Sequence, residues 1–166
     1  MRYHKLTATS EPGFYMMDSP RVSEDDILIM ANQLARQRFA KGRVLNNPQA
    51  VREHIRTLLQ HYEHEVFVVV LLDGQLRTMG YHELFRGTID TANVYPREVV
   101  KLALKHNASA MIVAHNHPSG IPTPSQADIQ VTKHLTQALA LVNVRVLDHI
   151  VVGTEGSTSM MERGLM

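Results

Sequence analysis

The chain has 166 residues, a length typical of one compact domain, and with 44% hydrophobic and 20% charged residues it can build a buried core. This composition excludes a disordered tail, and 17 basic against 16 acidic residues give no overall attraction to nucleic acid. Cysteine is absent, which excludes disulfides, a cysteine nucleophile and thiolate zinc sites, and fits a cytoplasmic protein. The longest apolar run, 66–72, is too short to cross a membrane, so we expect no membrane segment.

The first third of the chain predicts a lead-in followed by two helices. Residues 1–20 lack periodicity and are expected to be irregular. Residues 21–62 are expected to form a helical extension, with helices at 24–41 and 48–62. The expected caps are Ser23 and Asn47, and the expected core-facing residues are Ile27, Met30, Ala31, Leu34, Ala35, Val51, Ile55, Leu58 and Leu59.

From residue 63 to residue 166 the pattern changes to alternating strands and helices. Runs rich in β-branched residues predict buried strands, and helical spacing of apolar residues predicts the helices between them. The expected strands are 65–73, 76–85, 110–114, 144–152 and 158–161, the expected helices are 96–106 and 126–141, and a loop is expected at 88–95. This order predicts an α/β (α+β) domain, 63–166, in which helices flank a mixed β-sheet.

Two histidines and an aspartate form the main candidate site. His115 and His117 follow a predicted buried strand, and Asp128 lies in the first turn of the next predicted helix, three residues after Ser125. Residues two apart in an extended strand point the same way, so both imidazoles can reach one ion. Two imidazoles and a carboxylate are zinc ligands, and three protein ligands leave a fourth position for water. The pattern therefore predicts a catalytic zinc site, with the Ser125 hydroxyl as a nearby hydrogen-bond donor.

The same serine and aspartate have a purely structural interpretation. Ser125 and Asp128 stand at the spacing of a helix capping box, and a cap needs no metal. The chain holds ten histidines, so a pair two residues apart can also arise by chance. Spacing alone therefore leaves a metal site and a helix cap as alternatives, and the strand, loop and helix around the motif favour the metal site.

Several segments resemble known proteins. The histidine, serine and aspartate spacing is similar to the signature of the JAMM (MPN+) metalloproteases. More closely, the chain resembles the RadC family of bacterial JAMM-domain proteins, over about three fifths of its length from Glu65 onward. The segments that carry this resemblance are LFRGTID, PREVVKLALKHNASA, AHNHPSG, PSQAD and VRVLDHIVVG. Residues 1–60 lack the helix-hairpin-helix segment of longer members, so a short form is expected.

The resemblance implies a JAMM/MPN fold, which is cytidine deaminase-like, and one further functional residue. The family places a glutamate upstream of the histidines, and Glu65 is the matching position. Glu63 is also acidic and lies two residues away, so it stays an alternative. Tyr95 stands where the family commonly has histidine before Pro-Arg-Glu, which leaves any role of that histidine without a counterpart here.

The resemblance implies a zinc-dependent hydrolase of peptide or isopeptide bonds. Zinc would make hydroxide available at neutral pH, Glu65 would act as general base and then as general acid, and Ser125 would stabilise the oxyanion. The expected partner is a protein or peptide substrate. The alternatives are a DNA-repair accessory protein, the label historically attached to the family, and a non-catalytic MPN binding module. A nucleobase deaminase is excluded because its cysteine ligands are absent.

Overall fold

A five-stranded mixed sheet forms the centre of the fold. The structure is a computed structural model, and it describes residues 2–45, 47–87 and 94–166. The strand order is β5-β4-β6-β7-β8; β6 and β7 are parallel, and every other neighbouring pair is antiparallel. The strands are β4 Val66–Leu72, β5 Thr78–Arg86, β6 Ala110–Asn116, β7 Arg145–Gly153 and β8 Gly156–Ser159. The predicted mixed sheet is confirmed.

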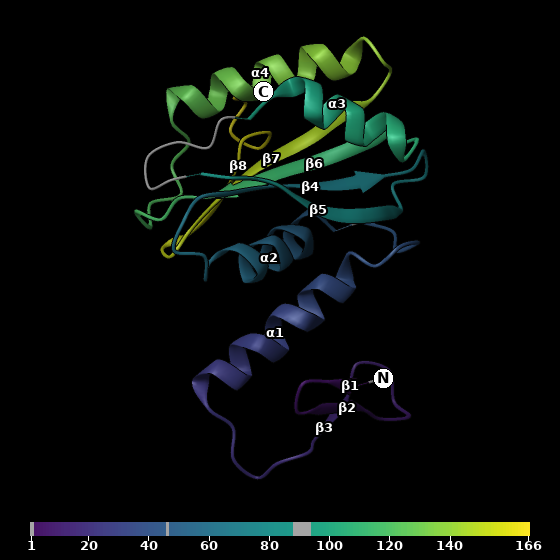
Figure 1. The fold of residues 1–166 in the computed structure, drawn as a ribbon, viewed down its shortest axis with the longest axis vertical. Coiled ribbons are helices and arrows are strands. Elements are labelled where there is room, and N and C mark those ends of the chain that lie inside the picture. The colour runs from purple at the N-terminus through teal and green to yellow at the C-terminus, as the bar shows by residue number, and fades with distance from the viewer. Residues whose placement is uncertain (1, 46, 88–93) are drawn as a thin grey trace.

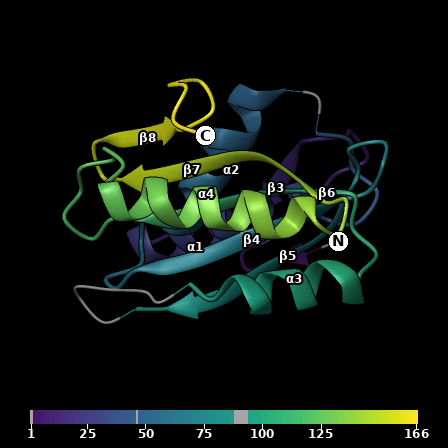
Figure 2. The ribbon, with the colours of Figure 1, turned by 90° about the horizontal axis from the view of Figure 1, so that it is seen from above.

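Helices cover both faces of this sheet. The helices α3 and α4 lie on one side and α2 lies on the other, with α1 beyond it (Figure 1), and Figure 2 looks down onto α3 and α4. The four helices are α1 Glu24–Arg38, α2 Pro48–Leu59, α3 Pro96–Lys105 and α4 Gln126–Ala140. In the described ranges no helix is long and apolar enough to cross a membrane. Residues 88–93, most of the predicted loop, lie outside the described residues.

The core has two layers because the sheet is covered on both faces. Every residue of β4 is buried, and alternate residues enter opposite layers, as the period of two in a strand requires. One layer contains Val68 with the predicted core face of α2, and the other contains Val69 with residues of α3 and α4. Because α2 packs in the main core, the boundary predicted between residues 62 and 63 does not coincide with a break in packing.

The prediction that Ile27 of α1 faces the core is wrong. Ile27 is 52% exposed, whereas Met30 and Ala35 are buried. Ala35 and Phe39 pack in the core layer that contains α2. Helical spacing identifies one face of α1, but it does not tell how far along the helix that face is covered. The first turn of α1 extends away from the sheet (Figure 1).

The expected irregular lead-in is also corrected. Three short strands, β1 Arg2–Tyr3, β2 Leu6–Ala8 and β3 Tyr15–Met17, form an antiparallel sheet in the order β1-β2-β3. Strands of two or three residues are too short to display an alternating pattern, so periodicity does not detect them. Asp26 of α1 ties this sheet to the helix by ion pairs with His4 and Lys5, each at 2.6 Å.

Candidate metal centre

The two motif histidines come together at the end of β6. His115 is 1% exposed, and its ring stacks on Phe67 of the neighbouring strand, with ring centroids 6.4 Å apart. His117 follows β6 directly, and its backbone N–H donates to Val152 O of β7 at 2.7 Å, which continues the pairing of these strands. The Nε2 atoms of His115 and His117 are 2.9 Å apart. The two imidazoles therefore face one point.

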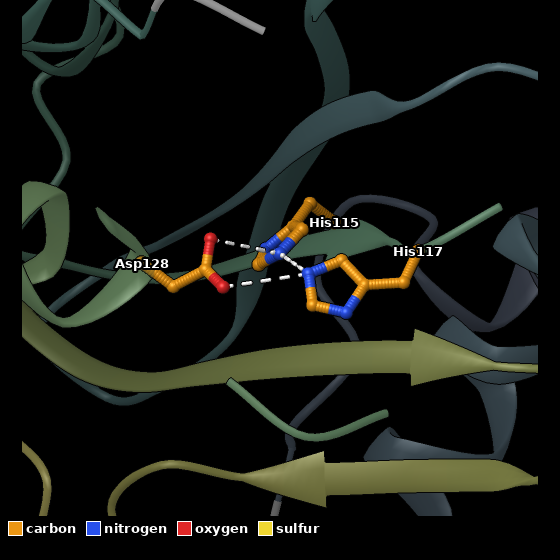
Figure 3. A group of neighbouring side chains, drawn as sticks. All are labelled: His115, His117 and Asp128. Atoms are coloured by element: carbon orange, nitrogen blue, oxygen red, sulfur yellow. Dashed lines mark hydrogen bonds and ion pairs between the residues drawn. The ribbon is translucent and has the colours of Figure 1, made fainter. Parts of the chain in front are cut away.

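Asp128 reaches the same point from the first turn of α4. Its Oδ1 lies 3.1 Å from His115 Nε2, and its Oδ2 lies 3.4 Å from His117 Nε2 (Figure 3). The parallel pairing of β6 and β7 requires a crossover, and α4 is the helix of that crossover. The start of α4 therefore lies close to the end of β6, and residues eleven or more positions apart in the sequence become neighbours. Ligand atoms of the three residues all lie within 4.8 Å of one another.

The loop between β6 and α4 turns sharply against β7, and two glycines allow it. Gly120 has a φ of +90°, a conformation that favours glycine. A Cβ atom on Gly153 would lie 2.0 Å from the carbonyl oxygen of Gly120, so the two backbones approach too closely for any side chain. The close approach keeps the loop, with His117 at its start, against the end of β7.

The hydrogen-bond partners of the rings direct the Nε2 lone pairs inward. His117 Nδ1 lies 2.9 Å from Ile121 O, and because a carbonyl only accepts, Nδ1 is the protonated nitrogen. His115 Nδ1 lies 2.8 Å from His149 Nε2, so its Nε2 is also the atom that faces the carboxylate. Two imidazole nitrogens and a carboxylate oxygen form a donor set that fits zinc. Because the Nε2 atoms of His115 and His117 lie only 2.9 Å apart, a proton or a cation must lie between them.

The electrostatics of the group suit a cation. Burial opposes ionisation of Asp128, but the polar contacts of the carboxylate with the His115 and His117 rings outweigh it and hold the pKa of that carboxyl well below its usual range. The hydrogen bond that His117 donates to the Asp128 carboxylate in turn raises the pKa of His117. In the absence of metal a proton on His117 stabilises the carboxylate, and a metal ion would take the place of that proton.

Strand register brings Glu65 to this group. β4 is antiparallel to β6, with Phe67 opposite His115, so the residue two positions before Phe67 lies beside His117. Burial raises the pKa of Glu65, and the charges of Asp128 and the two histidines act on it as well. Glu63 is exposed. Of the two candidate glutamates, Glu65 is therefore the one placed beside the group.

The asparagine between the two histidines holds the segment that carries Glu65. Asn116 Oδ1 accepts from the backbone N–H of Val66 at 2.8 Å, and its Nδ2 donates to the carbonyls of Tyr62 and His64 at 3.2 and 3.0 Å. Asn116 is 3% exposed, so these bonds are protected from water. A single side chain thus fixes the backbone on both sides of Glu65.

Ser125 caps α4, as the structural interpretation of the motif predicts. Its Oγ accepts from Asp128 N at 3.1 Å, and Asp128 Oδ2 accepts from the Ser125 N–H at 2.6 Å. The Ser125 hydroxyl also donates to Asp128 Oδ2 at 2.7 Å. The cap and the metal-binding group therefore share the Asp128 carboxylate, and the two interpretations of the motif are compatible.

Three contributors to this centre escape sequence reasoning. His149 is fully buried and contacts His115, and no sequence pattern predicts this contact. The contact of Thr132 with His149 and the backbone contacts of Asn116 are not predicted by the sequence either. A partial signal exists for Thr132, which lies one helical turn after Asp128. His149 lies 34 residues from His115, and only the pairing of β6 with β7 brings them together.

The fold and this group define a JAB-type domain, and comparison with known proteins agrees. The family model described as RadC-like JAB domain matches residues 45–165, which is well over half of the chain. The chain therefore belongs to the RadC family. The matched region begins before α2, in agreement with the packing of α2 in the main core.

Three similar relatives each carry the name UPF0758 protein. One from Cellvibrio japonicus is 54% identical over 138 residues, which are 83% of this chain and 62% of the relative. Two from Vibrio cholerae are 54% and 51% identical over 144 and 146 residues, which are 91% and 92% of those proteins. This chain thus covers less than two thirds of the Cellvibrio protein but nearly all of the two Vibrio proteins.

Proposed function

We propose that this chain is a zinc-dependent hydrolase of amide bonds in a protein or peptide, with His115, His117 and Asp128 as the ligands. The observation that supports the proposal most is the orientation of the two rings. Both Nδ1 atoms bond to groups behind the site, so both Nε2 atoms and the Asp128 carboxylate face one point. A helix cap requires the aspartate and the serine, but it requires neither histidine.

The residues around the ligands have complementary roles in the proposed reaction. Bound zinc supplies a Lewis acid that activates water and polarises the carbonyl. Glu65 accepts a proton from the attacking water as the new carbon–oxygen bond forms, and then delivers that proton to the amine nitrogen as the carbon–nitrogen bond breaks. The raised pKa of Glu65 suits a group that must both take and release a proton. In the reaction the Ser125 hydroxyl hydrogen, which bonds to Asp128 Oδ2 in the structure, turns to the carbonyl oxygen of the substrate as that oxygen becomes negative.

A peptide-library digest tests the proposed activity. We expect cleavage by the zinc-loaded protein, loss of cleavage when a chelator removes the metal, and recovery when zinc is added back. Cleavage that persists after complete metal removal would contradict a zinc mechanism. A library and an isopeptide-linked substrate that both stay intact with the zinc-loaded protein would instead favour a non-catalytic binding module.

Replacing Ser125 with alanine separates capping from catalysis. Loss of the cap should lower the free energy of unfolding by about 0.5–2 kcal/mol. Loss of the oxyanion donor should lower kcat on a cleaved peptide by roughly 10²–10³-fold. The matched control is Ser23→Ala, because Ser23 caps α1 through the same capping box with Asp26. Equal kcat in the two variants, measured beside urea unfolding, would leave Ser125 as a cap only.

Replacing Asn116 with alanine should release the segment that carries Glu65. The buried Val66 N–H and two carbonyls lose their partner, so unfolding free energy should fall by about 1–3 kcal/mol. We expect kcat to fall with little change in KM, because Glu65 loses its position while peptide contacts remain. Asn47→Ala is the control, since Asn47 caps α2 through one backbone bond. If Asn116→Ala is less stable but keeps its kcat, the hydrogen bonds of Asn116 have a structural role only.

A further inference from the structure

A buried line of hydrogen bonds runs behind the candidate metal centre. His115 Nδ1 lies 2.8 Å from His149 Nε2, and His149 Nδ1 lies 2.5 Å from Thr132 Oγ1. Thr132 Oγ1 in turn lies 2.5 Å from the backbone oxygen of Asp128. His149 and Thr132 are both 0% exposed, so water does not compete for these bonds. The line begins at one proposed ligand and ends on the backbone of another.

The last member of the line sets the direction of every bond in it. The Asp128 carbonyl can only accept, so Thr132 donates its single hydroxyl hydrogen there. The sulfur of Met160, at 3.7 Å from the hydroxyl, is a weaker and more distant acceptor. The Thr132 oxygen then accepts from His149 Nδ1–H, which leaves His149 Nε2 as an acceptor. His149 Nε2 accepts from His115 Nδ1–H, and the lone pair of His115 Nε2 is directed at the centre.

If these hydrogen bonds ran in the opposite direction, His115 could not offer its Nε2 lone pair to a metal ion. If Thr132 donated to His149 Nδ1, then His149 Nε2–H would donate to His115 Nδ1, and the neutral His115 would carry its hydrogen on Nε2. That hydrogen would occupy the lone pair needed for a metal. His117 has no such ambiguity, because its Nδ1 partner is the Ile121 carbonyl itself. His115 has an imidazole as its partner, and an imidazole can donate or accept at either nitrogen.

We propose that Thr132 and His149 are positioning residues that fix the tautomer of His115, so that its Nε2 lone pair is available to a metal ion before the ion arrives. This inference rests on the proposed zinc site. It assigns a role to two buried polar residues that neither the ligand motif nor the helix cap requires. The His149 ring lies between His115 and Thr132, and a ring that donates at Nδ1 and accepts at Nε2 agrees with this role.

Zinc affinity of a Thr132→Val variant tests the role of the line. Valine keeps the shape of threonine but leaves His149 Nδ1 without its acceptor. We expect zinc affinity to fall by roughly 10–100-fold, the range typical when a partner behind a ligand is removed. Thr132→Ser should restore near-wild-type affinity because it returns the hydroxyl. Thr57→Val is the matched control, since Thr57 makes the same bond to a carbonyl four residues earlier, Glu53 O, in α2.

Nitrogen-15 NMR of the metal-free protein tests the tautomers directly and needs no variant. The proposal predicts hydrogen on Nδ1 of both His115 and His149, and a lone pair on both Nε2 atoms. Hydrogen on Nε2 of either ring in the neutral protein would overturn it. In Thr132→Val, the His149 signals should shift towards the other tautomer.

Failure of this inference is distinguishable from failure of the proposed function. If the wild-type protein binds no zinc, the proposed function is wrong. The positioning role is then wrong as well, because no metal ion uses the lone pair of His115. If the wild-type protein binds zinc and Thr132→Val binds it equally well, the zinc site stands and the positioning role is wrong. Equal losses in Thr132→Val and Thr57→Val would also overturn the positioning role.

Discussion

Glu65→Gln is expected to keep zinc and to lose hydrolysis. Glutamine has the shape of glutamate but cannot take a proton from water, and general base catalysis typically contributes about 10²–10⁴-fold to the rate. Glu65 is not in the ligand group, so zinc content should stay at the wild-type level. The measurement is kcat and KM on a peptide from the library digest, beside metal analysis of the same preparation. We expect the loss in kcat rather than in KM.

Glu63→Gln is the matched control for this prediction. Glu63 lies two residues earlier on the same segment and is exposed, so its replacement should leave kcat unchanged. Loss of activity in Glu63→Gln alone would mean that Glu63, and not Glu65, is the general base. Full activity in Glu65→Gln would exclude the proposed mechanism.

Asp128→Asn is expected to abolish tight zinc binding. The change removes the negative charge of the one carboxylate in the group. We expect zinc affinity to fall by more than the roughly 10–100-fold that is typical when a hydrogen-bond partner of a ligand is removed. Asparagine keeps a side-chain oxygen that can accept from the Ser125 N–H, so the cap of α4 should persist. The measurement is zinc affinity by competition with a chromophoric chelator, with circular dichroism to verify the fold.

The chain provides a matched control for Asp128 in α1. Asp26 closes the same capping box with Ser23, where the Ser23 N–H donates to Asp26 Oδ2 at 2.9 Å. Asp26→Asn should therefore leave zinc affinity unchanged. Zinc binding by Asp128→Asn at wild-type strength would show that Asp128 acts as a cap and not as a ligand. Equal weakening in the two variants would attribute the loss to the helix caps.

Much of the fold could be predicted because local chemistry agrees with the tertiary structure. The capping residues Ser23, Asn47 and Ser125 mark the starts of their helices as predicted. The run 66–72 is buried throughout, as its continuous apolar character predicts. The short strands β1 to β3 and the exposure of Ile27 could not be predicted, because they depend on pairing and coverage by distant segments.

The candidate site was only partly predictable for the same reason. His115, His117 and Asp128 lie close in the sequence, so spacing and the strand-to-helix context suffice to propose that they meet. Family resemblance, and not local spacing, identifies Glu65, and the antiparallel register of β4 with β6 gives the physical reason for its position. The contact of His149 with His115 depends on the parallel register of β6 with β7, and a single sequence does not encode that register in any local pattern.

Zinc titration of the metal-free protein, followed by isothermal calorimetry, tests the central claim most directly. The claim is that His115, His117 and Asp128 together hold one ion, so saturation is expected at about one zinc per chain. A His115→Ala/His117→Ala double variant should show no saturable binding while remaining folded. No saturable binding by the wild-type chain, or equal binding by the double variant, would contradict the claim.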